Sequence, residues 1–123
     1  MSYSIDLIIE KLPADQQQAW QKIEALREVY YEDERPVAAQ LQQLHDQLTE
    51  RYPCLCDFAD DDPAMDDSPW ADGPMINNFS HDMGMLAIVF SKVEEVLPFI
   101  IQQATALGIT VADGQDGQIY QPE

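Results

Sequence analysis

The chain has 123 residues, of which 23 are Asp or Glu and only 6 are Lys or Arg, so the formal net charge is −17. Such a surface repels nucleic acid and anionic membranes and attracts basic proteins or cations. We therefore expect one domain over residues 1–123 that binds a basic protein partner and makes no direct contact with nucleic acid or membrane. The alternative is a surface whose charge serves solubility alone.

The cysteines and the N-terminus bear on location. No apolar run approaches the roughly 20 residues that a membrane span needs. The opening residues 1–6 lack the basic segment and the cleavage site of a signal peptide. Cys54 and Cys56 are separated by one residue, which is too close for an unstrained disulfide, and two thiols do not complete a zinc site. We expect reduced thiols, no metal or other cofactor, and a cytoplasmic location.

The first half of the chain predicts a strand followed by two helices. Residues 2–10 alternate between apolar and polar side chains, which is typical of a strand with one buried face. A helix begins near Leu12, and apolar residues recur at helical spacing as far as Tyr30. After a break at residues 32–36, a second helix runs to about Tyr52. Because the break is short, we expect the two helices to form an antiparallel pair.

The last third predicts a strand (83–90), a helix (92–107), a strand (109–112) and a short return through residues 119–120. Both faces of the first of these strands are apolar, which indicates a strand that is covered on both faces or lies centrally with its ends well buried. Ser91 and the glutamate three residues later form a capping-box pattern at the helix start. Residues 75–80 are a further candidate strand.

Between residues 54 and 74 the periodicity disappears, and aspartates and prolines surround a single Trp70. Loops of this length in a compact domain are usually functional or disordered. Concentrated negative charge speeds encounter with a basic partner. The tryptophan either anchors the loop in the core, which we prefer, or forms a partner hot spot. The predicted partner surface consists of Asp57, Asp60, Asp61, Asp62, Asp66, Asp67, Trp70 and Asp72.

The loop has other interpretations besides a partner surface. A calcium loop starting at Asp60 would have Met65 where an EF-hand requires glycine and Ala71 where it requires glutamate, so an EF-hand is excluded. A weak, irregular cation site and a merely solvated loop stay as alternatives. The chain has no hydrolase, nucleotide-binding or metalloprotease motif. No catalytic residue and no metal ligand is therefore assigned.

Three stretches resemble a group of small, mostly uncharacterised bacterial proteins. They are the opening residues 1–7, similar to the group's M-S-Y-D-L strand, the middle-loop segment 69–74, and residues 93–115. The last five residues of that third stretch stand where the group usually has V-Y-D-P-Q, with Ala112 and Gly114 as departures. Some of these proteins look like immunity partners of bacterial toxins. The resemblance implies no catalytic residue.

The element order strand, helix, helix, strand, strand, helix, strand predicts an α+β fold, with about four strands in one sheet and helices mainly on one face. A ferredoxin-like arrangement with residues 2–10 and 83–90 at its centre is one option. We expect a non-enzymatic acidic interaction protein, in the form of a toxin-neutralising immunity protein. The alternatives are a mimic of nucleic-acid charge, which would occupy a DNA- or RNA-binding surface, and then a small enzyme or weak cation binder. One shared core is predicted from Leu7, Trp20, Leu86, Ile88, Phe90, Val96 and Ile100.

Overall fold

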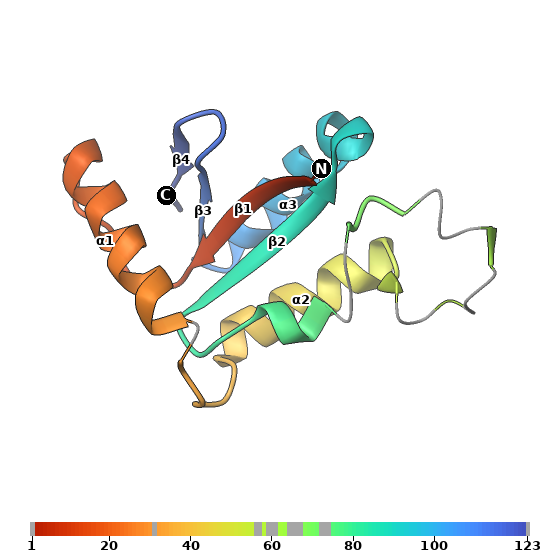
Figure 1. Cartoon of the computed structure of the whole chain (residues 1–123), viewed down its shortest axis with the longest axis horizontal. Helices are drawn as coiled ribbons and strands as arrows, with labels where there is room; N and C mark the ends of the chain where they lie inside the picture. Colours follow the sequence, from red (N-terminus) through yellow and green to blue (C-terminus); the bar gives the residue numbers. More distant parts are fainter. Residues whose placement is uncertain are drawn as a thin grey trace.

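The computed structural model describes residues 2–30, 32–55, 58, 62–63, 68–71 and 75–122. Three α-helices and one four-stranded sheet make up these residues, so the predicted α+β class is confirmed (Figure 1). None of the helices within these ranges is long and apolar enough to cross a membrane. The elements are, in order, β1 (Ser2–Ile8), α1 (Gln16–Tyr30), α2 (Ala39–Arg51), the 3-10 helix η3 (Met75–Asn78), β2 (Met83–Val89), the 3-10 helix η4 (Phe90–Lys92), α3 (Val93–Ala106), β3 (Thr110–Asp113) and β4 (Gln118–Tyr120).

The sheet is antiparallel throughout, in the order β2-β1-β3-β4. β1 pairs with β2 along its whole length, but with β3 only over residues 6–8. A ferredoxin-like sheet, which is also antiparallel, is matched only in part, because the strand that would pair with the outer edge of β2 is replaced among the described residues by isolated bridges from Trp70 and Phe79. The prediction that residues 83–90 form a central strand is wrong, since β1 and β3 occupy the centre.

β2 lies at the margin of the sheet, and a segment from the middle of the chain covers its outer edge. The Val89 N–H donates to the Pro69 carbonyl at 2.8 Å, and the Ala71 N–H donates to the Ala87 carbonyl at 2.9 Å. Between them Trp70 is only 2% exposed, and its indole N–H donates to the Tyr52 carbonyl at 2.7 Å. The segment protects a hydrophobic edge that would otherwise be open to aggregation. The core-anchoring role expected for Trp70 is confirmed.

The helices cover both faces of the sheet unequally, with α2 and α3 on one face and α1 on the other (Figure 1). The larger core cluster joins Leu7 and Ile88 to buried residues of α2 and α3, and the smaller one joins Ile8 to α1. Helices lie mainly on one face, as predicted, but α1 and α2 do not form the expected pair. The single predicted core is wrong in two members. Trp20 packs in the smaller cluster, and Phe90 is 45% exposed.

Since α1 covers the second face of β1, this strand is buried on both faces instead of the predicted one. Asp6 lies on that second face and is 2% exposed. Its carboxylate accepts hydrogen bonds from Nε of Arg27 at 3.0 Å and from Nη2 of the same guanidinium. Burial raises the pKa of Asp6 by more than the hydrogen bonds and charge of Arg27 lower it. An ion pair between the buried Asp6 carboxylate and the partly exposed Arg27 guanidinium therefore fixes α1 against the sheet.

Residues 75–80 do not form a strand, so the element order differs from the predicted one at that point. η3 is followed by an isolated bridge between Phe79 and Gly84. A Cβ added at Gly84 would lie 2.7 Å from Cδ1 of the Phe79 ring. Glycine at this position in β2 thus leaves room for a buried aromatic ring.

α3 ends as predicted but begins differently. Ser91 lies in η4, and the N-cap residue Lys92 makes no side-chain hydrogen bond, so the predicted capping box is wrong. At the other end Gly108 has φ +78°, a conformation that favours glycine. The Ile109 N–H donates to the Ala104 carbonyl at 2.9 Å, which completes a Schellman motif. This sharp stop leads the chain directly from α3 into β3.

Candidate functional site

The predicted acidic partner surface falls mostly outside the described residues. Trp70 and Asp62 are described, the first buried in the core and the second half-buried. With its indole buried, Trp70 does not present the partner hot spot that was the alternative to core anchoring. The members that lie outside the described residues are Asp57, Asp60, Asp61, Asp66, Asp67 and Asp72.

The metal-binding alternatives gain no support from the described residues. No three His, Cys, Asp or Glu side chains within them lie close enough together to hold a metal ion. The Nδ1–H group of His81 donates a hydrogen bond to the Pro36 carbonyl oxygen, 2.8 Å away. Cys54 is buried in the larger core cluster, and Cys56 lies outside the described residues. The redox state of the two cysteines stays a prediction.

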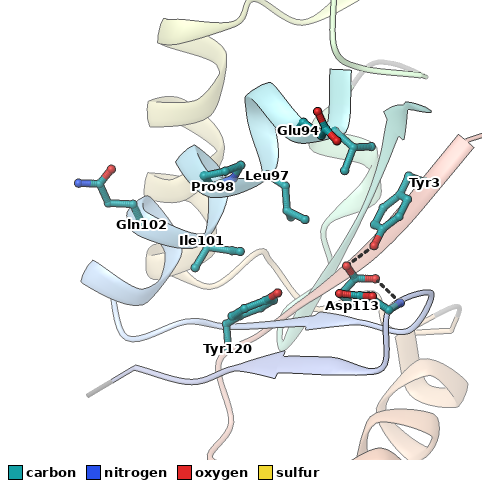
Figure 2. A pocket seen from close by; sticks show the side chains of 10 residues that line it. Tyr3, Glu94, Leu97, Pro98, Ile101, Gln102, Asp113 and Tyr120 are labelled. Carbon is teal, nitrogen blue, oxygen red and sulfur yellow. Dashed lines mark hydrogen bonds between the residues drawn. The ribbon is translucent and has the colours of Figure 1, made fainter. Parts of the chain in front are cut away.

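A groove of about 700 Å³ opens between α3 and the strands of the sheet (Figure 2). One wall is formed by Leu97, Pro98 and Ile101 of α3. Tyr120 of β4 and Tyr3 of β1 form the opposite side. Figure 2 shows the side chains of Leu97 and Ile101 reaching from the helix toward the strands, with Tyr3 and Asp113 together at one end.

The groove exists because β3 is short and α3 is apolar on more than its core face. Residues 2–5 of β1 have no partner strand on the β3 side, where the chain turns away after Asp113. The Ser4 N–H is satisfied there by the side-chain carbonyl of Gln115, at 2.9 Å. On α3, Ile100 is fully buried, whereas its neighbour Ile101 is only half-buried. Apolar side chains of the helix are therefore left facing an opening in the sheet.

Tyr3 and Asp113 form the polar end of the groove. The Tyr3 hydroxyl donates to Oδ2 of Asp113. The other carboxylate oxygen, Oδ1, accepts from the backbone N–H groups of Gln115 and Asp116, both at 3.1 Å. Asp113 is 1% exposed, and both of its oxygens are engaged. These hydrogen bonds hold the β3–β4 turn and the Tyr3 ring in place.

The charges around the groove are negative. Glu94, in the first turn of α3, and Asp116, in the β3–β4 turn, line it and are both exposed. No Lys or Arg is among the described residues that line it. Arg27 is held by Asp6 on the opposite face of the sheet. The groove therefore combines an apolar wall with uncompensated carboxylates at its rim.

Sequence patterns indicated the elements of this groove but not the groove itself. Leu97 and Ile101 belong to an apolar stripe at helical spacing, and Tyr3 belongs to an alternating strand. Both patterns are typical of core residues. The one usable signal was the breadth of the apolar surface on α3, where residues 96, 97, 100 and 101 are all aliphatic and exceed a single core stripe.

Replacing Tyr3 by Phe is expected to reduce the loss of stability at alkaline pH. Partial burial and the hydrogen bond to Asp113 raise the pKa of Tyr3 above its ordinary value of 10.0. The folded protein therefore keeps a proton that the unfolded chain releases, so the stabilisation is complete below about pH 10 and is lost as the pH rises through the raised pKa. Urea unfolding of both proteins at a series of alkaline pH values measures the difference. Identical slopes of stability against pH would show that the pKa of Tyr3 is not raised in the folded protein.

Comparison of the chain with protein-family models, with curated proteins and with solved structures finds no match. The function has to be inferred from the chain's own residues, chiefly its charge and the groove beside α3.

Proposed function

We propose that this protein is a non-enzymatic acidic binding protein for a basic protein partner, and that it acts in the cytoplasm as an immunity-type neutraliser of a toxin. The observation that carries the proposal is the excess of 23 acidic over 6 basic residues. Ion pairs within the protein also neutralise some of its few basic side chains. Arg27 is bound by Asp6, and Arg35 lies 2.7 Å from carboxylate oxygens of both Asp33 and Asp82.

The exposed acidic residues are spread over several elements of the described fold. A field of this kind attracts a basic protein over a distance and raises its association rate by about 10-fold to 10³-fold. It also discriminates against acidic and nucleic-acid partners. The exposed members among the described residues are Glu10, Asp15, Glu24, Glu28, Glu32, Glu34, Asp46, Glu50, Glu94, Glu95 and Asp116.

The loop at residues 54–74 is the part of this surface that we assign to early encounter with the partner. It carries seven aspartates and no Lys or Arg, and Trp70 fixes one end of it in the core. Charges that are concentrated in this way act before contact is made, so their loss changes the association rate more than the dissociation rate.

Replacing Asp60, Asp61 and Asp62 by Asn is expected to slow association with the partner by about threefold or more at low salt, and to make the dependence on ionic strength shallower. The partner is first recovered by affinity purification from the cells of origin, and association rates are then measured against salt. The matched control replaces Glu24, Glu28 and Glu32 by Gln, which removes the same charge from α1 and the residues after it. An unchanged rate for the Asn variant would contradict the role of the loop. Equal slowing of association in both variants would mean that the overall charge, and not the loop, accelerates the encounter.

Two observations separate neutralisation of a toxin from mimicry of nucleic-acid charge. A neutraliser is expected to be encoded beside the toxin gene and to rescue growth when the two are co-expressed. A charge mimic would instead compete with duplex DNA for many basic proteins, because it would occupy their phosphate-binding surfaces. Failure to recover any basic partner at low salt would overturn the proposal in both forms.

A further inference from the structure

We infer that the groove between α3 and the sheet is the docking site for a basic, partly apolar segment of the protein partner, with a Lys or Arg side chain lying along it. This inference rests on the proposed function and names the surface that makes the close contact, as distinct from the loop that steers the encounter.

The wall of the groove is apolar and accessible. Leu97, Ile101 and Tyr120 are half-buried and Pro98 is exposed. Phe90, which is 45% exposed, extends this surface beyond Tyr3. The two rings stand edge to face with their centres 5.9 Å apart. A contiguous apolar surface rimmed by polar residues is the usual mark of an interaction site, whereas single exposed apolar residues are not.

The rim of the groove selects for a cation. Glu94 and Asp116 are exposed carboxylates that line it from two different elements, α3 and the β3–β4 turn. The rings of Tyr3 and Tyr120 add π-faces to which an ammonium or guanidinium is attracted. Lys and Arg side chains have an apolar stem and a positively charged head. The stem complements the apolar wall of the groove, and the head complements its acidic rim.

Other occupants fit the groove less well. A second copy of the chain would also carry a net charge of −17, so the two copies would repel each other. A purely apolar ligand would cover Glu94 and Asp116 without pairing them, which costs free energy because a desolvated charge needs a partner. A basic segment satisfies both the wall and the rim.

Neighbouring glutamates on α3 supply a matched pair of variants. Glu94 and Glu95 are both exposed and both lie in the first turn of α3, so they interact equally with the helix dipole. Only Glu94 lines the groove. Changing either residue to Lys alters the net charge by the same amount. A difference in binding between the two variants therefore reports the position of the charge and not its quantity.

The probe is a labelled hexapeptide in which leucine and arginine alternate, titrated at low salt and followed by fluorescence anisotropy. Glu94→Lys is expected to weaken binding by about tenfold or more, since it places a cation where the peptide's cation binds, while Glu95→Lys changes it much less. A peptide with glycine in place of leucine is expected to bind more weakly to the wild type. In methyl NMR spectra of the wild type, the Leu–Arg peptide is expected to shift the signals of Leu97 and Ile101.

Thermal unfolding of both variants shows whether each is folded. If the Glu94→Lys variant is unfolded, Asp116→Asn tests the other end of the groove. Equal losses in the two Lys variants, unshifted Leu97 and Ile101 methyls, or no binding to the wild type would each overturn the groove as the docking site. These outcomes leave the proposed function in place. That proposal is tested by recovery of a basic partner and by the Asn variants of the loop, none of which alters the groove.

Discussion

Replacing Arg27 by Met is expected to lower the free energy of unfolding by about 3–5 kcal/mol at neutral pH, because the substitution leaves a buried carboxylate without its partner. Asp6 is 2% exposed beneath α1, and both of its hydrogen bonds from a side chain come from the Arg27 guanidinium. Methionine retains an apolar stem that packs in the same space, so the loss reports the charge more than the packing.

The dependence of this loss on pH distinguishes a buried charge from lost packing. Burial already raises the pKa of Asp6 in the wild type, and removal of the cation raises it further. The folded variant then keeps a proton on Asp6 that the unfolded chain releases above about pH 4. The variant's deficit is therefore smallest below that pH and grows as the pH rises through the raised pKa.

Urea unfolding of wild type and Arg27→Met, at acidic and at neutral pH, measures this deficit. Adding Asp6→Asn to the variant is expected to recover much of the stability, since a neutral amide tolerates burial better than an unpaired carboxylate. Arg35→Met is the matched control. Its side chain is 54% exposed, and Asp33, whose side chain is only 4% exposed, still accepts a hydrogen bond from the Arg35 backbone N–H after the substitution, so a smaller loss is expected. A deficit of equal size at both pH values would contradict the buried-charge interpretation.

The parts of the fold that could be predicted are those whose signal is local. The spacing of Leu41, Leu44 and Leu48 indicated α2, and all three are fully buried. The apolar run of residues 83–90 indicated β2, whose faces are one buried and one half-buried, and Gly108 marked the end of α3. In each case a side chain and the neighbours that determine its structure lie within one or two turns of the same element.

The parts that could not be predicted depend on contacts between distant residues. Asp6 stands in an alternating strand as though it faced solvent, and only Arg27, on α1, makes its burial acceptable. The position of β2 at the margin was hidden because Trp70 and its neighbours cover the edge from a loop without periodicity. A local pattern shows that a residue will be covered, but not which segment covers it.

The groove was missed because its residues look like core residues but are left partly uncovered. Leu97 and Ile101 have the spacing of core residues, and whether such residues are covered depends on the length of β3 and the direction of the turn after Asp113. The acidic loop, in contrast, was evident from composition alone, because it contains seven aspartates between residues 57 and 72. Composition indicated the charge of the proposed partner, and only the fold revealed the groove in which we propose that it docks.

Replacing Ile88 by Ala is expected to lower the free energy of unfolding by about 2–5 kcal/mol, because the removed methyl groups leave a cavity that the core refills only in part. Ile88 is fully buried in the larger cluster. It is paired with Tyr3 of β1 at one edge of β2 and with Trp70, through an isolated bridge, at the other edge. Ile88→Val should lose about 0.5–1.5 kcal/mol, which makes a graded series.

Ile119→Ala in β4 is the matched control, since this residue is half-buried and its truncation opens little enclosed volume. Its loss should be clearly smaller than that of Ile88→Ala in the same urea titration. Similar losses at the two positions would mean that the segment at residues 69–71 does not close over β2 in solution. Ile88 would then lie at an open sheet edge, and Trp70 would be free of the core and available to a partner after all. A large difference between the two variants would instead keep Trp70 as the anchor of the acidic loop, and the proposed partner contact would then involve the loop's aspartates and the groove beside α3.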